Sequence, residues 1–171
     1  MSRWIGFVLT SLLAVAAHCA QPLQPALQQL PDARFPVANK VVTGALDASQ
    51  IASLPRAGIR HIVNLRPAEE HPSLDEARVA NEHGLEYHAI PIKGAQSLTL
   101  ENAKALDRVL GEIGDEPTLL HCSSGNRVGA LIAVREAWIK GKSPEEAVGI
   151  GKAWGLAGLE ESVRALLEER P

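Results

Sequence analysis

Cysteine is scarce in this 171-residue sequence, which contains only Cys19 and Cys122. Two cysteines cannot build a disulfide framework, so the fold must depend on a hydrophobic core. Aromatic residues make up 4% of the chain, and its three tryptophans form no array on which nucleic-acid bases could stack. A formal net charge of −3 also gives no reason to expect nucleic acid or an anionic membrane surface as a partner.

Long apolar runs are missing as well, except within the first 20 residues. Those residues carry one basic side chain, Arg3, then an apolar stretch, then small residues, which is typical of a secretory signal peptide. We therefore predict that residues 1–20 are removed, which leaves no membrane span and a periplasmic or secreted protein with Cys122 as its single thiol. The alternatives are a retained N-terminal anchor and a lipoprotein modified at Cys19.

Apolar, β-branched runs alternate with helix-like segments along the rest of the chain. Residues 21–39 are rich in Pro, Gln and Ala and are predicted to be a disordered lead-in, and residues 40–171 form one domain. The alternation predicts an α/β fold with a mostly parallel sheet of four to five strands between layers of helices. The strands are expected near residues 40–46, 59–65, 85–92 and 117–122, and helices are expected to begin after Asp47, Ser73, Thr99 and Ser143.

The stretch "LLHCSSGNRVGAL" places Cys122 between a predicted strand and a predicted helix. The first amides of a helix have no partner inside it, so residues 123–127 can form a cradle for an anion. Gly125 permits the tight backbone that such a loop needs, and Arg127 supplies a guanidinium fork for an oxyanion. The same positive field favours a nucleophilic thiolate at Cys122. The alternative is a small buried cysteine beside a surface arginine.

These residues carry a family resemblance. "HCSSGNRVGAL" resembles the H-C-x-x-G-x-x-R-[ST] loop of cysteine-dependent, dual-specificity-type protein phosphatases. "VVTGALDASQIASLPRAGIRHIVNLRP" resembles the opening strand, helix and "NLRP" strand of that group, most closely its bacterial beta-lactamase hydrolase-like phosphatase-like domains. The resemblance implies a three-layer phosphatase-like domain that hydrolyses phosphotyrosine, on a phosphorylated protein, or another small phosphoester.

The resemblance also implies residue roles. Cys122 would attack phosphorus and form a phosphocysteine, while His121 would hydrogen-bond the nearby backbone and help to set the thiolate. Arg66, which directly follows a predicted buried strand, could add positive charge to the same site. The phosphoryl oxygens would be held by the Arg127 side chain and by the backbone amides of the loop, namely those of Ser123, Ser124, Gly125, Asn126 and Arg127.

The sequence departs from the phosphatase pattern at two positions. Only four residues separate Cys122 from Arg127, where the pattern has five, and Val128 replaces the Ser or Thr that helps the thiolate to leave. Rhodanese-type sulfurtransferases also use a C-x-x-x-x-R loop, in which the cysteine carries a persulfide. A rhodanese-like sulfurtransferase and a non-catalytic anion-binding module therefore stay open as alternatives.

The general acid is not evident from the sequence. Related phosphatases place an Asp in the loop that corresponds here to "KGAQSL", which contains no carboxylate and has Lys93 at the comparable place. The loop after Leu65 also leaves the carboxyl end of a strand, so Glu70, or else Glu69, is predicted to be the acid.

Neither a cofactor nor a metal is predicted. The histidines at positions 61, 71, 83 and 88 show no pair at ligand spacing with an acidic third partner along the sequence.

Overall fold

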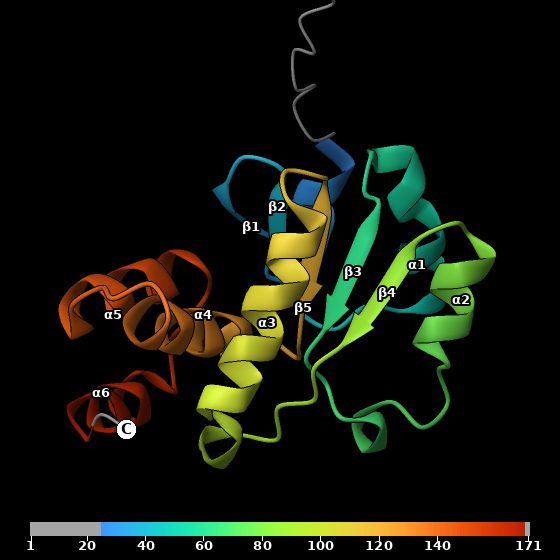
Figure 1. Ribbon diagram of the computed structural model, residues 1–171. Coiled ribbons are helices and arrows are strands. Elements are labelled where there is room, and N and C mark those ends of the chain that lie inside the picture. Colours follow the sequence, from blue (N-terminus) through green and yellow to red (C-terminus); the bar gives the residue numbers. More distant parts are fainter. Residues whose placement is uncertain (1–24, 170–171) are drawn as a thin grey trace, which may run out of the picture.

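The computed structural model describes residues 25–169 (Figure 1), and the predicted signal peptide lies outside them. A five-stranded sheet forms the centre, with the strand order β1-β2-β5-β3-β4. All neighbouring pairs are parallel except β1 with β2, so the predicted mostly parallel α/β sheet is confirmed. The strands are β1 (Arg34–Val37), β2 (Lys40–Thr43), β3 (His61–Asn64), β4 (Glu86–Ala89) and β5 (Thr118–His121).

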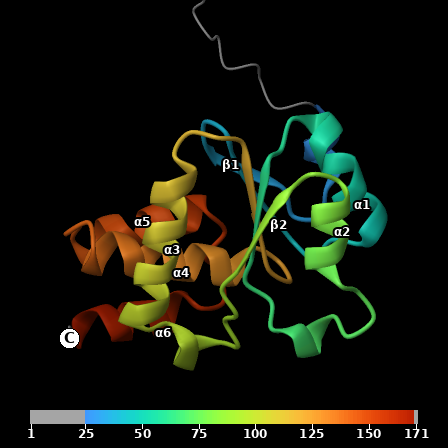
Figure 2. The same ribbon diagram turned by 45° about the vertical axis from the view of Figure 1, so that its right-hand side comes forward.

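Helices cover both faces of the sheet (Figures 1 and 2). Successive strand residues point to opposite faces of the sheet, so the strands contribute side chains to two hydrophobic cores, one on each face. Val41, Ile62 and Leu119 belong to the core that contains the residues of α1 and α2, whereas Val42 and Val63 belong to the core with α3 to α6. The helices are α1 (Ala48–Ser53), α2 (Glu76–Glu82), α3 (Leu100–Ile113), α4 (Asn126–Trp138), α5 (Pro144–Ala153) and α6 (Glu160–Glu168).

Three of the four predicted helix starts are confirmed. Asp47 and Ser143 form capping boxes, and the side chain of Thr99 accepts a hydrogen bond from the amide of Asn102. The predicted cap at Ser73 is wrong, because α2 begins at Glu76 after the N-cap residue Asp75. Glu76 cannot reach back to cap the helix, since its side chain turns into the protein and is only 1% exposed.

The predicted disorder of residues 21–39 is wrong for residues 25–39. That segment contains the 3₁₀ helix η1 (Pro25–Gln29) and the strand β1, and Leu27 is buried in the core beside α1. An edge strand gains its backbone hydrogen bonds from its neighbour, so a proline-rich composition does not prevent it from forming. Within residues 25–169, no helix has both the length and the apolar character to cross a membrane.

The parallel strands bring distant loops to one edge of the sheet. Asn64 of β3 lies level with His121 of β5, and the leucine after β3 donates its amide hydrogen bond to the His121 carbonyl. The chain that follows each of the four parallel strands, β2 to β5, therefore leaves from the same edge. In sheets of this type, ligands bind at the carboxyl ends of the strands.

Candidate active site

Cys122 lies at this edge, at the point where β5 passes into the loop before α4. Its side chain is 1% exposed. Gly125 forms the N-terminal cap of α4 with a φ of +81°, a left-handed conformation that favours glycine. A Cβ atom at this position would also lie 3.1 Å from both Arg34 Nη1 and Val42 Cγ1. The tight turn predicted from the sequence is therefore present.

Arg127 holds the carboxylate of Glu70 in a two-pronged contact. Arg127 Nη1 donates to Glu70 Oε1 at 2.6 Å, and Nη2 donates to Oε2 at 2.7 Å. Ser123 Oγ donates to Glu70 Oε2 at 3.0 Å and accepts a 2.6 Å hydrogen bond from Arg127 Nη2. Arg127 Nη1 also donates to the carbonyl of Ile92 at 2.8 Å, which fixes the orientation of the guanidinium. The structure thus shows two of the predicted anion-binding residues holding an oxyanion.

The pKa values reflect this contact. Hydrogen bonding to Arg127 is the main reason that the pKa of Glu70 falls from 4.5 to about 2, with Ser123 and the charge of Arg66 helping against the opposing effect of burial. Hydrogen bonding to Glu70 raises the pKa of Arg127, and the thiolate form of Cys122 contributes in the same direction. Arg127 and Glu70 therefore form a charge cluster beside Cys122, in which Glu70 is ionised at neutral pH.

Arg66 belongs to the same cluster, but its guanidinium already has partners. Its Nη2 atom donates to the backbone carbonyl of Glu70 at 2.5 Å, and its Nε atom lies 3.5 Å from Glu70 Oε2. Its Nη1 atom lies 3.6 Å from Glu76 Oε1. In this arrangement, Arg66 positions the turn that carries Glu70.

A buried polar network lies behind Cys122. Glu76 of α2 accepts a 2.6 Å hydrogen bond from Asn64 Nδ2, and its Oε2 atom lies 3.2 Å from His121 Nε2. Burial opposes ionisation of Glu76, but His121, His71 and Arg66 together hold its pKa below the usual value. Both ring nitrogens of His121 lack a hydrogen-bond partner among the described residues, so the predicted hydrogen bond from His121 to the nearby backbone is wrong, and the ring faces Glu76 instead.

Two of the predicted phosphate-binding residues also make other contacts. The Asn126 side chain accepts hydrogen bonds from the amides of Ala157 at 2.8 Å and Leu159 at 3.3 Å, so it anchors the segment between α5 and α6. The carbonyl of Ser124 accepts a 3.3 Å hydrogen bond from Arg34 Nη1. What these two residues can still offer an anion is their backbone amides at the start of α4.

The two carboxylates considered for the general acid are separated by the structure. Glu69 pairs with Lys93 at 2.9 Å, and both side chains are mainly exposed. Glu70 is the one that reaches Arg127. An ionised carboxylate has no proton to donate, and the role of Glu70 as general acid stays a prediction.

Sequence reasoning missed three contributors to this site: Arg34, Asn64 and Glu76. Arg34 lies in the segment that was predicted to be disordered. Glu76 lies three residues after Ser73, which is the spacing of a capping box, and this spacing gives no sign that its side chain turns inward. Only Asn64 had a usable signal, because a polar residue inside the apolar run "IRHIVNL" needs a buried partner.

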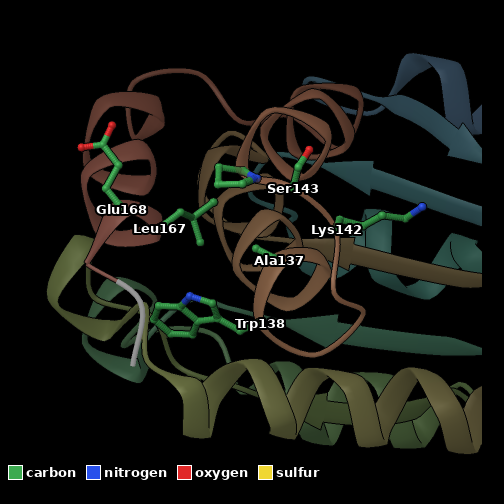
Figure 3. A pocket seen from close by; sticks show the side chains of 7 residues that line it. Ala137, Trp138, Lys142, Ser143, Leu167 and Glu168 are labelled. Carbon is green, nitrogen blue, oxygen red and sulfur yellow. The ribbon is translucent and has the colours of Figure 1, made fainter.

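Two hollows of the described surface are lined by neither Cys122 nor Arg127. One of about 340 Å³ lies between α4, α5 and α6 and is lined by Trp138, Lys142 and Leu167, among others (Figure 3). Its lining residue Ser143 uses its hydroxyl to cap α5, so the candidate active site is located by the chemistry of Cys122 and Arg127 and not by this hollow. A second hollow of about 310 Å³ reaches the network through Glu76 and Tyr87.

Solved structures define the class of fold. The chain is similar to a protein from Shewanella putrefaciens named "Putative phosphatase (DUF442)", with a TM-score of 0.65 and 19% identity over 84% of this chain and 95% of the other. A phosphatase-named protein from Neisseria meningitidis gives a TM-score of 0.62 at 24% identity over 81% and 97%. The structure named Tk-PTP gives 0.57 at 24% identity over 82% and 99%. The fold is therefore that of phosphatase-like α/β domains, as predicted.

The sequence points to a narrower group. The chain is 30% identical over 119 residues to a "Beta-lactamase hydrolase-like protein" of Xylella fastidiosa. The aligned region covers 67% of this chain and 27% of that protein. The chain thus spans about a quarter of the length of the curated relatives it matches. The predicted resemblance to this group is confirmed, while no family model matches the chain.

Proposed function

We propose that this chain is a cysteine-dependent phosphatase, in which Cys122 is the nucleophile toward a phosphomonoester. The observation that carries the proposal is the carboxylate of Glu70, held by both prongs of Arg127 and by Ser123 beside Cys122. A phosphoryl group offers a guanidinium the same pair of oxygens as a carboxylate. This contact supports an oxyanion receptor next to a nucleophile.

The proposed reaction has two steps. In the first, the Cys122 thiolate bonds to phosphorus, and the ester oxygen leaves with the bonding electron pair and takes up a proton. In the second, water attacks phosphorus and the S–P bond breaks, which releases inorganic phosphate and restores the thiolate. Arg127 and the amides at the start of α4 would stabilise the charge on the phosphoryl oxygens in both steps.

The state of Glu70 bears on the substrate class. A phosphate that binds Arg127 must displace Glu70, which then loses the partner that keeps its pKa near 2. Even at its ordinary pKa, Glu70 would be a weak proton donor at neutral pH. We therefore favour substrates whose leaving oxygen needs little protonation, such as the aryl oxygen of phosphotyrosine, on a protein or a small molecule. A periplasmic or secreted location is part of the same proposal.

A sulfurtransferase is the second candidate, because four residues separate Cys122 from Arg127. In that reaction the thiolate takes the sulfane sulfur of thiosulfate as the S–S bond breaks and sulfite leaves. Cyanide then removes the sulfur as thiocyanate.

One experiment separates the candidates. The reduced chain, Cys122→Ser and the matched control Cys19→Ser are assayed with an aryl phosphate and, separately, with thiosulfate plus cyanide. Phosphate release that is lost only in Cys122→Ser, together with a phosphocysteine detected by mass spectrometry, supports the phosphatase. Thiocyanate without phosphate release supports the sulfurtransferase. Activity in neither assay leaves an anion-binding module, and hydrolysis that survives in Cys122→Ser refutes the mechanism.

A further inference from the structure

A cluster of two histidines and a glutamate lies at the end of the sheet opposite Cys122. His61 is the first residue of β3 and is level with Glu86, the first residue of β4. His88 lies two residues beyond Glu86, so its side chain points to the same face of the sheet. One donor atom from each of these three residues lies within 4.8 Å of the others.

The imidazole of His61 is oriented by a carboxylate on its far side. Its Nε2 atom lies 3.3 Å from Glu116 Oε2, and an ionised carboxylate can only accept, so Nε2 carries the hydrogen. The other ring nitrogen, Nδ1, lies 3.5 Å from Glu86 Oε2 and has no hydrogen-bond partner among the described residues. A cation between Nδ1 and Glu86 Oε2 would give both atoms a partner.

His88 presents a second unsatisfied nitrogen. Its Nε2 atom is buried and has no hydrogen-bond partner among residues 25–169. The His61 and His88 rings are stacked, with centroids 5.9 Å apart and 28° between their planes. A buried ring nitrogen without a hydrogen-bond partner can bind a metal ion.

We infer that His61, Glu86 and His88 form a binding site for a divalent transition-metal ion of the Zn²⁺ type. Two imidazole nitrogens and one carboxylate oxygen are a donor set that Zn²⁺ accepts, with water as the fourth ligand. The contact of Glu116 with the ring nitrogen of His61 that faces away from the site is typical of histidine ligands. Because Glu86 has a 73% exposed side chain, it can move to bring the donors to bonding distance.

The site lies apart from the proposed chemistry. Asn64 lies three positions after His61 along β3, which corresponds to roughly 10 Å. A bound ion would join β3 to the edge strand β4, so its expected effect is on stability. The spacing of residues along the sequence did not predict this metal site, because no sequence pattern shows that His61 and Glu86 lie level in neighbouring strands.

The test uses the full chain with Cys19→Ser, which removes one competing thiol, and Zn²⁺ as the probe. Isothermal titration should show one equivalent bound, with the affinity reduced about tenfold or more by His88→Ala, Glu86→Gln or Glu116→Gln. The exposed His83 provides the matched control, so His83→Ala and Cys122→Ser should leave the affinity unchanged. Thermal melts should show a rise in Tm with Zn²⁺ that is lost in His88→Ala.

Three outcomes would overturn this inference. The first is no Zn²⁺ binding in the micromolar range, in which case His61 is a ring that hydrogen-bonds between two carboxylates. The second is binding that Cys122→Ser abolishes, and the third is binding that His83→Ala weakens as much as His88→Ala. Circular dichroism of each variant separates loss of the site from loss of the fold.

Discussion

The contact between Glu70 and Arg127 predicts that Glu70 competes with phosphate for the same guanidinium. The drop in pKa from 4.5 to about 2 corresponds to roughly 3 kcal/mol, at 1.36 kcal/mol per pKa unit. One third of the Glu70 side chain is exposed to water, and screening by solvent reduces this to about 1–2 kcal/mol. Glu70→Gln should therefore bind inorganic phosphate roughly 5–30-fold more tightly.

Isothermal titration of the reduced chain with inorganic phosphate at pH 7 measures this effect. Glu69→Gln is the matched control, because it removes the same charge one residue away from a side chain that contacts Lys93 instead of Arg127. An unchanged affinity in Glu70→Gln, or an equal gain in Glu69→Gln, would refute the competition. In the first case phosphate binds without displacing Glu70, and in the second the gain is a general effect of charge.

Stability against pH gives an independent check on the same contact. Because the pKa of Glu70 is lowered by folding, its contribution is present above about pH 4.5 and is lost as the pH falls toward 2. In phosphate-free buffer, Glu70→Gln should lower the free energy of unfolding by about 1–2 kcal/mol at pH 7. The difference from the parent protein should shrink between pH 4.5 and 2, as measured by urea unfolding at several pH values.

Three further predictions concern the scaffold. Glu76→Gln should lower the free energy of unfolding at pH 7 by about 3 kcal/mol, because it removes the buried negative charge that faces His121. Urea unfolding at several pH values should show this loss shrinking as the pH falls below about 4.5. Gly129→Ala should destabilise the fold by about 1–3 kcal/mol or more and so lower Tm, because the new Cβ would lie 2.1 Å from the amide nitrogen of Leu156. An unchanged thermal melt would mean that α4 and α5 can move apart without cost. Asp47→Ala should cost about 1 kcal/mol through loss of the capping box, with Asp47→Asn recovering most of it.

Local patterns accounted for much of the fold. Apolar runs with β-branched residues became strands, and the caps at Asp47, Thr99 and Ser143 became helix starts, because both depend on neighbours within a few residues. The errors fell where distant partners decide the outcome. The strand β1 exists because β2 lies beside it, and Glu76 turns inward because Asn64 and His121 are there to meet it.

The sequence by itself determined that Cys122 and Arg127 lie close together at one strand-to-helix junction, since only four residues stand between them. Only the tertiary structure decided that Glu70, 57 residues away from Arg127, meets it, and that Glu69 does not. The same holds for His61 and Glu86, which become neighbours through the register of β3 and β4. The physical reason is that contacts across a parallel sheet are set by strand order and register, which depend on the packing of both cores and on no short stretch of sequence.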